Sequence, residues 1–225
     1  MGQDDLFFGG EGDSWFRRNR DALETGGMMD WPAHLVGMMA GREDIRSVIE
    51  VGCCNGYRLA KLRGILPADC RFVGTDASLE AVRDGRERYP WIEFHRALLS
   101  EIPLKEAFDL VIVHFVLHWV DRRTLARSVS EIDRVIRDGG VLVLGDFLPD
   151  YPQRRKYHHL PEAGVYTYKQ DYAGIFEALG TYKEFARIAF DHSGTDGPVL
   201  RATPSADRGY CALLKKSLET YYPEV

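Results

Sequence analysis

Two short segments, about twenty residues apart, carry residue types that can bind a nucleotide. The first is an apolar run ending in a turn bounded by Gly52 and Gly56, with Glu50 two positions before the first glycine. The second, Phe72–Asp76, is an apolar run that ends on a carboxylate. A strand, a glycine turn, a helix and a second strand with a terminal acid form a nucleotide-binding βαβ unit. Its turn lets the backbone approach the ligand, and its acid accepts hydrogen bonds from ribose hydroxyls.

The composition of the turn distinguishes among nucleotides. A dinucleotide site uses three glycines so that a pyrophosphate can lie at a helix N-terminus. Here the turn reads Gly-Cys-Cys-Asn-Gly and contains no basic side chain. The acidic Glu50 favours a ligand with a cationic group, and Asp76 favours an adenosine. A sulfonium amino acid joined to adenosine has both features.

At these residues the chain resembles the class I S-adenosylmethionine-dependent methyltransferases, whose first motif reads roughly acid-x-Gly-x-Gly-x-Gly. It departs from that motif at Cys54, which replaces the middle glycine. The resemblance covers roughly residues 28–218 and implies S-adenosyl-L-methionine as the cofactor. Direct contact of Glu50 with the cofactor and contact through water both stay open. The implied cofactor contacts are Glu50, Gly52, Cys53, Cys54, Gly56, Asp76, Ala77, Ala97, Leu98, His114, Phe115, Trp15, Arg18 and Asn19.

The adjacent Cys53 and Cys54 could also be interpreted as nucleophiles or a redox pair. Adjacent cysteines meet disulfide geometry only with strain. We therefore interpret them as small residues that fill a tight turn.

Two histidines follow the most strand-like run, Phe108–His114, in the order His-Phe-Val-Leu-His-Trp. The segment lacks the acid or Asn followed by Pro-Pro-aromatic that is typical of methyltransferases acting on DNA adenine or protein glutamine. It is similar instead to the apolar, histidine-containing version of small-molecule enzymes. That resemblance implies that His114 faces the cofactor and His118 lies near the methyl group. A packed structural histidine is the alternative for each.

The remaining elements alternate as in a doubly wound α/β protein. The pattern predicts a mostly parallel seven-stranded sheet of the Rossmann-like methyltransferase type, with an antiparallel C-terminal strand pair at Tyr182–Phe190 and Tyr210–Lys215. It also predicts a helix over Asp121–Arg137 that is ended by the Asp138–Gly140 turn. The other expected strands are 46–51, 71–76, 91–97, 108–114 and 141–145, and the other helices 56–65, 78–89 and 170–179.

Two aromatic-rich segments lie outside these predicted strands and helices, and we expect both to cover the active site. They divide the chain into an N-terminal cover segment, residues 1–27, and a methyltransferase domain, residues 28–225, with 147–169 as a cover loop. The cover loop holds three candidate substrate contacts, Tyr157, Tyr166 and Tyr168, whose rings could stand beside a sulfonium. Ordinary packing is the alternative for these tyrosines.

Histidine is the natural base for a hydroxyl acceptor. The candidates are His118, His158 and His159. On an extended chain the adjacent His158 and His159 would point to opposite sides, so at most one of them should face the pocket.

Composition limits the classes of partner. The net charge of −5 argues against nucleic acid, and the four cysteines form neither a disulfide framework nor a zinc pattern. The N-terminus is polar, and the longest apolar run, around Leu110–Val120, is too short to span a bilayer. We expect a cytoplasmic enzyme with a small-molecule acceptor and no metal, nucleic acid or membrane partner; a homodimer stays open.

The reaction implied by the resemblance is methyl transfer to an oxygen or nitrogen of a small molecule, such as a sugar or natural-product intermediate. Two alternatives from other classes remain. One is a nicotinamide-dependent dehydrogenase, against which the missing third glycine argues. The other is a catalytically silent scaffold that keeps the cofactor site.

Overall fold

The computed structural model describes residues 2–25, 29–39, 41, 43–192, 204, 207–222 and 224. Seven strands form one sheet in the order β3-β2-β1-β4-β5-β9-β8. The pairs from β3 to β5 are parallel, and β9 is antiparallel to both β5 and β8. This confirms the predicted sheet and its antiparallel C-terminal pair. The strands are β1 (Ser47–Val51), β2 (Arg71–Asp76), β3 (Glu93–Arg96), β4 (Phe108–His114), β5 (Ile136–Phe147), β8 (Tyr182–Asp191) and β9 (Arg208–Lys216).

Helices bury both faces of this sheet. Strand β4 shows the division, because successive side chains point to opposite faces. Val111 and Val113 pack in the cluster that contains α6 and α7, whereas Leu110 and Ile112 pack in the cluster that contains α3, α4 and α5. Burial on both faces explains why β4 is apolar throughout. The helices are α3 (Trp31–Met39), α4 (Tyr57–Leu62), α5 (Leu79–Arg88), α6 (Leu125–Arg134) and α7 (Ala173–Ala178).

The predicted end of the helix before β5 is wrong. Helix α6 ends at Arg134, and Gly139 and Gly140 lie inside β5 rather than in a turn before it. The register between β4 and β5 shifts between Phe108 and Leu110, and Gly139 has a φ of +71°. Glycine at such a bulge adopts a backbone that other residues avoid, so these glycines bend a strand.

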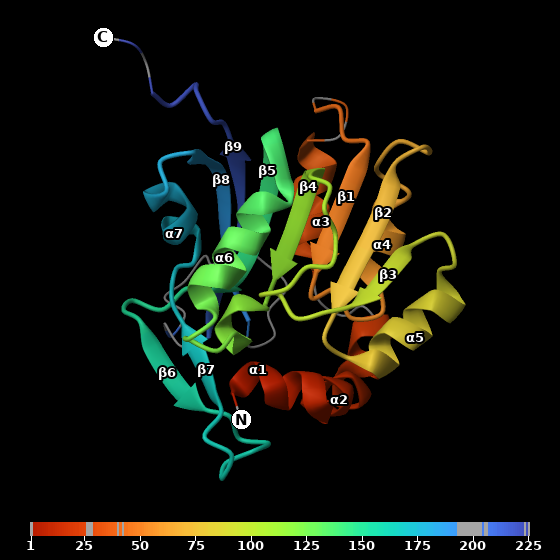
Figure 1. The fold of residues 1–225 in the computed structure, drawn as a ribbon, viewed down its shortest axis with the longest axis vertical. Helices are drawn as coiled ribbons and strands as arrows, with labels where there is room; N and C mark the ends of the chain where they lie inside the picture. The colour runs from red at the N-terminus through yellow and green to blue at the C-terminus, as the bar shows by residue number, and fades with distance from the viewer. Residues whose placement is uncertain are drawn as a thin grey trace.

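Two further parts of the chain lie outside the seven-stranded sheet. Residues 3–25 form α1 (Gln3–Leu6), a wider π-helical turn η1 (Phe7–Glu11) and α2 (Gly12–Thr25). The expected cover loop contains a two-stranded hairpin, β6 (Gln153–Lys156) and β7 (Tyr166–Lys169). In Figure 1 the N-terminal helices lie beyond the arrowheads of β1, β2 and β4, and the hairpin lies beside them.

Gln3 joins the N-terminal helix to this hairpin. Its side-chain amide donates to the carbonyl oxygens of Trp119, at 2.6 Å, and Tyr166, at 2.8 Å. The Tyr166 amide in turn donates to Gln3 Oε1 at 3.0 Å. The two segments that sequence patterns leave outside the sheet therefore contact each other.

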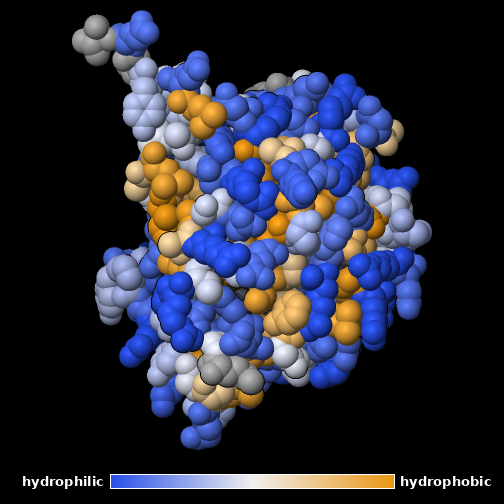
Figure 2. Space-filling model, in the orientation of Figure 1, coloured by the Kyte–Doolittle hydropathy of each residue, from blue (hydrophilic) through white to orange (hydrophobic). Residues whose placement is uncertain are grey.

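Hydrophilic residues predominate on the face of the molecule shown in Figure 2, and hydrophobic residues lie between them. Within the described ranges, no helix combines the length and the apolar character that a membrane span requires.

Candidate active site

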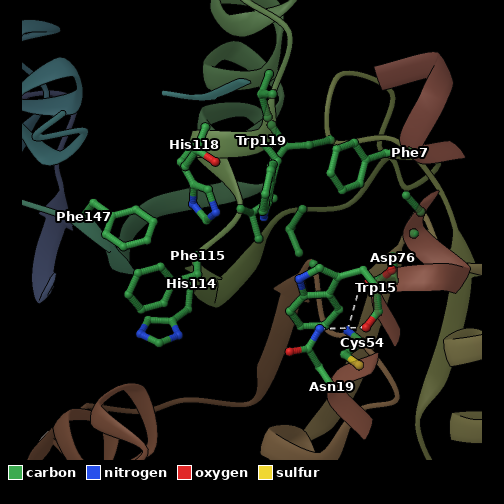
Figure 3. Close-up of a pocket in the computed structure, with 18 of the residues that line it drawn as sticks. Phe7, Trp15, Asn19, Cys54, Asp76, His114, Phe115, His118, Trp119 and Phe147 are labelled. Atoms are coloured by element: carbon green, nitrogen blue, oxygen red, sulfur yellow. Dashed lines mark hydrogen bonds between the residues drawn. The ribbon is translucent and has the colours of Figure 1, made fainter. Parts of the chain in front are cut away.

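A cavity of about 890 Å³ lies at the carboxyl ends of β1, β2 and β4, where ligands bind in open α/β sheets. Side chains from α2, the hairpin and the strand ends line it. Figure 3 shows two groups across the cavity: Trp15, Asn19, Cys54 and Asp76 on one side, and His114, Phe115, His118 and Phe147 on the other. Its volume lies in the upper part of the range for small-molecule sites.

The turn after β1 needs glycine at its first position for two reasons. Gly52 has a φ of +75°, and a Cβ there would lie 2.2 Å from Val116 Cγ2. Cys54, which replaces the middle glycine of the motif, also has a positive φ, at 54°. Phe115, at the end of β4, has a φ of 55°. Left-handed non-glycine residues are uncommon and gather at functional sites.

Asp76 ends β2 at the cavity, half-buried, as predicted. Its Oδ2 accepts a hydrogen bond from the Cys54 amide at 2.8 Å, and its Oδ1 accepts one from the Ser78 amide at 2.8 Å. Burial raises the pKa of Asp76 although these two amides oppose the shift. The carboxylate therefore fixes the glycine turn and the start of α5 while it faces the cavity.

Most of the predicted cofactor contacts line this cavity. They are Gly52, Cys54, Asp76, Ala77, Ala97, Leu98, His114, Phe115, Trp15 and Asn19. Four others are not among its lining residues: Glu50, Cys53, Gly56 and Arg18. Gly56 has a φ of +80° and would place a Cβ 2.6 Å from Phe94 Cζ, so it serves the packing of the turn.

The buried carboxylate of Glu50 has Arg58 as its ion-pair partner. Glu50 is buried and forms an ion pair with the Arg58 guanidinium, which also donates to Asp30 Oδ1 at 2.7 Å. Burial raises the pKa of Glu50 to about 7, against the opposing charge of Arg58. Burial would also raise the pKa of Asp30, but Arg58 and Lys61 outweigh it and lower that pKa to about 2. Arg58 and Asp30 line the cavity, so they present one charge of each sign next to Gly52.

Arg58 is not among the predicted site residues, because it lies in α4, outside the Gly52–Gly56 turn in which a basic side chain was expected to indicate a phosphate ligand. The available signal is its position in the first turn of α4, directly after Gly56 and Tyr57. A side chain there lies close to the carboxyl end of β1.

The neutral ring of His114 packs between Arg58 of α4 and Gly145 of β5. Arg58 Nη2 lies 3.2 Å from His114 Nδ1, so Nδ1 accepts and Nε2 carries the proton. Burial, with the nearby Arg58 charge, holds the pKa of His114 well below its ordinary value. A Cβ at Gly145 would lie 2.3 Å from His114 Cδ2, so the glycine makes room for the ring. His114 Nε2 lacks a hydrogen-bond partner among the described residues.

His118 is oriented by a buried carboxylate that the sequence did not point to. It lies in the short helix η2 (Leu117–Trp119), and its Nδ1 is 2.9 Å from Asp146 Oδ1 at the end of β5. The amides of His118 and Phe147 also donate to Asp146, at 3.2 and 2.8 Å. Because an ionised carboxylate only accepts, Nδ1 carries the proton and Nε2 keeps its lone pair. With Nδ1 bonded to Asp146, Nε2 is the ring nitrogen that can exchange a proton with a group in the cavity.

The cover segments bring further predicted residues to the cavity. Tyr157, His158 and His159 all line it. The expectation that at most one of the two adjacent histidines faces the pocket is wrong. Both lie in a turn rather than on an extended chain, and their ring centroids are 3.9 Å apart.

Arg18 holds Tyr157 rather than lining the cavity. Arg18 Nη2 donates to the Tyr157 hydroxyl at 2.6 Å, and that hydroxyl donates to Glu11 Oε1 at 2.7 Å. Arg18 and Glu11 also form an ion pair. This partly buried network joins α2 to the segment after β6.

Tyr166 and Tyr168 do share one face of β7, but not the face toward the cavity. Thr167 and Lys169, which alternate with them, line it instead. Tyr166 stacks with the Arg154 guanidinium at 4.6 Å, and Tyr168 stacks with that of Arg122 at 4.3 Å.

The cysteines have structural positions. All four are buried and free, and burial together with the Asp76 charge holds the pKa values of the Cys53 and Cys54 thiols well above their ordinary range. Protonated thiols are poor nucleophiles. In the described part of the chain, no group of three or more His, Cys, Asp or Glu side chains could hold a metal ion.

Comparison with known proteins agrees with this architecture. Residues 49–144 match the family model of a methyltransferase domain. Over 132 residues the chain is 32% identical to a probable S-adenosylmethionine-dependent methyltransferase of Mycolicibacterium smegmatis, covering 58% of this chain and 44% of the relative. It is 33% identical over 103 residues to the trans-aconitate 2-methyltransferase of an Azoarcus species, covering 45% and 39%. The chain thus spans less than half the length of these relatives.

Among solved structures, the chain is similar to the 1,6-didemethyltoxoflavin-N1-methyltransferase of Burkholderia thailandensis. The TM-score is 0.69 with 14% identity, over 92% of this chain and 86% of that one. At this identity the likeness establishes the fold, which is that of the class I methyltransferases. The matched domain model and the mycobacterial relative are those of methyltransferases, the relative being a probable S-adenosylmethionine-dependent one, and neither favours the dehydrogenase alternative.

Proposed function

We propose that this protein transfers a methyl group from S-adenosylmethionine to an oxygen or nitrogen of a small molecule. The observation that carries the proposal is one cavity with two chemically different ends. Asp76 and the Gly52 turn lie at one end, and His118, oriented by Asp146, lies at the other. The cavity volume allows a cofactor and a small acceptor to bind together.

The residues present fit S-adenosylmethionine. Asp76 can accept hydrogen bonds from ribose hydroxyls, and Ala77, Ala97 and Leu98 offer an apolar surface to a purine. Arg58 and Asp30 match the carboxylate and the ammonium of a methionyl group, since each is of the opposite charge. When bound, the cofactor supplies an electrophilic methyl group on a sulfonium.

The protein itself supplies the proton transfer and the positioning that the reaction needs. A hydroxyl acceptor must lose its proton as its oxygen bonds to the methyl carbon, and His118 Nε2 has the free lone pair for that proton. Asp146 then stabilises the imidazolium that forms. An amine acceptor needs only to be neutral and positioned, which leaves His118 a binding role. In both cases the two cover segments exclude water and align donor and acceptor.

A small acceptor is supported by the aromatic rings that line the cavity. The rings of Phe7, Trp119 and Tyr157 stand over it, with centroids 5.0 Å apart for Phe7 and Trp119 and 4.6 Å apart for Trp119 and Tyr157. The solved structure named above is of an N1-methyltransferase with 1,6-didemethyltoxoflavin and S-adenosylhomocysteine bound together, which agrees with such an acceptor.

Ligand-dependent stability tests the proposal. S-adenosylhomocysteine at a hundredfold excess over its dissociation constant should stabilise the fold by about 2.7 kcal/mol, because it binds the native state alone. NAD should leave the melting temperature unchanged. A melting curve that S-adenosylhomocysteine does not move, in protein freed of cofactor by unfolding and refolding, would count against the proposed function.

A further inference from the structure

Trp119, the neighbour of His118 in η2, brings a hydrogen-bond donor to the same wall of the cavity. Both residues line the cavity, and their ring centroids are 4.8 Å apart. Figure 3 shows the two rings next to each other, with their nitrogen atoms toward the open cavity. An indole nitrogen only donates, whereas the unprotonated nitrogen of a neutral imidazole accepts. This wall therefore presents a donor beside an acceptor.

The Trp119 ring is held in a fixed orientation. Its centroid lies 5.0 Å from that of Phe7 and 4.6 Å from that of Tyr157. Its backbone is fixed as well, because the Trp119 amide donates to the Val116 carbonyl at 2.9 Å and the Trp119 carbonyl accepts from Gln3 at 2.6 Å. A donor that is already in place needs little reorganisation when a ligand binds.

The indole N–H of Trp119 lacks an acceptor within the protein. No described residue accepts a hydrogen bond from it, and its nitrogen is not among the fully buried atoms without a partner, so it is accessible. The Tyr157 hydroxyl, on the ring beside it, is already bonded to Arg18 and Glu11. A donor left unpaired in a mostly apolar site costs free energy, which an oxygen atom of a ligand can recover.

We propose that the methyl acceptor is a hydroxyl oxygen, held by the Trp119 indole N–H and by His118 Nε2. The inference rests on the proposed function and decides between the oxygen and the nitrogen that it leaves open. A hydroxyl has one proton and two lone pairs. The proton is donated to His118 Nε2, one lone pair accepts from Trp119, and the other faces the methyl carbon.

The same pair of residues serves the reaction. The lone pair that faces the methyl group forms the oxygen–carbon bond, and the sulfur keeps the electron pair of the carbon–sulfur bond that breaks. The hydroxyl proton passes to His118 Nε2, so the product is a neutral ether. The bond from Trp119 stabilises the negative charge that builds on the oxygen as its proton leaves.

Two other acceptors fit this wall less well. A neutral amine has a single lone pair, so a bond from Trp119 would take the electrons that must attack the methyl carbon. If the amine does not accept that bond, the indole donor stays unpaired. A carboxylate has no proton to donate to His118 Nε2.

Nitrogen-15 NMR of the tryptophan side chains tests the inference. The chain has four tryptophans, and the signal that disappears in Trp119→Phe identifies the indole of Trp119. Protein saturated with S-adenosylhomocysteine is titrated with phenol, aniline and benzoate, which carry a hydroxyl, an amine and a carboxylate on the same ring. We expect phenol to shift the Trp119 indole proton and to bind roughly threefold or more tightly than aniline, as one hydrogen bond allows.

Trp119→Phe keeps a ring against Phe7 and Tyr157 but removes the donor, so it should abolish the preference for phenol over aniline. Trp31→Phe is the matched control. Trp31 also lines the cavity and carries an indole, but it belongs to α3 and packs on Phe190, so its replacement should keep the preference. Both variants should bind S-adenosylhomocysteine like the wild type, which also shows that they fold.

Four results would overturn the inference: aniline that binds as tightly as phenol, benzoate that binds in place of phenol with the same shift, a Trp119 signal that no probe moves, or an equal loss of preference in Trp31→Phe and Trp119→Phe. Any of these in protein that binds S-adenosylhomocysteine refutes the assignment of a hydroxyl acceptor alone. Wild-type protein that does not bind S-adenosylhomocysteine refutes the proposed function itself.

Discussion

The backbone amide of Cys54 lies 2.8 Å from Asp76 Oδ2, so one carboxylate both faces the cavity and holds the glycine turn beside it. Removal of this carboxylate should therefore affect affinity and stability together. Cys54, which replaces the middle glycine of the motif, is thus held in place by Asp76 at the end of the neighbouring strand β2.

Asp76→Ala should weaken binding of S-adenosylhomocysteine roughly ten- to hundredfold, which corresponds to about 1.5–3 kcal/mol for hydrogen bonds to a charged group. It should also lower the free energy of unfolding, because the Cys54 and Ser78 amides lose their acceptor. Asp76→Asn keeps one acceptor oxygen and should recover part of both losses. Calorimetry and urea unfolding measure the two effects, and wild-type affinity in Asp76→Ala would make the residue purely structural.

Gly52→Ala should lower the free energy of unfolding by about 1–3 kcal/mol, since it combines a left-handed backbone with a contact against Val116. Val116→Ala removes the contact and leaves the backbone strain. In a double-mutant cycle, Gly52→Ala should therefore cost less in the Val116→Ala background. Urea unfolding of the four proteins checks this, and additive effects would show that the contact is not a source of the cost.

His118→Gln should lower the single-turnover rate on a hydroxyl acceptor roughly 10²–10⁴-fold while cofactor affinity is kept. Asp146→Asn should lower the rate in the same way, because the amide can hold the imidazole with the proton on the wrong nitrogen. His158→Ala and His159→Ala are the matched controls, since both residues line the same cavity. Near wild-type rates in His118→Gln, with a loss in one of the controls, would assign the base to the turn after β6.

Glu50→Gln should gain stability relative to the wild type as pH rises from about 4.5 to 7. The pKa of Glu50 is raised by burial to about 7 in the folded protein, so over this range the unfolded chain releases a proton that the folded chain retains. Wild-type stability then falls with increasing pH, by about 3 kcal/mol at 1.36 kcal/mol per pKa unit. The glutamine variant lacks this contribution. Urea unfolding of both proteins at pH 4.5, 6 and 7.5 measures the difference, and a constant difference would contradict the raised pKa.

The sequence was sufficient for the features that depend on local pattern. The apolar runs of β1, β2 and β4 predict buried parallel strands, and the Gly52 turn and Asp76 do line the cavity. Each of these signals lies within a few residues of the group that it positions.

Features that depend on tertiary register could not be predicted in this way. Asp146 meets His118 because β5 ends beside η2, and no local spacing encodes that approach. The choice between Tyr168 and Lys169 as the cavity residue depends on how the β6–β7 hairpin faces the sheet. The assignment of Gly139 to a turn failed because a bulge inside a strand uses the same residue types as a turn.

The contacts of Gln3 have a consequence for how the chain is made. Gln3 is synthesised 116 residues before Trp119 and 163 residues before Tyr166, its partners in the finished fold. At ribosomal rates of 5–20 residues per second, an interval on the order of ten seconds separates the synthesis of Gln3 from the synthesis of its acceptors. The helix that contains Gln3 is therefore made well before the groups that fix it, and these contacts over the cavity form only after Tyr166 has been made.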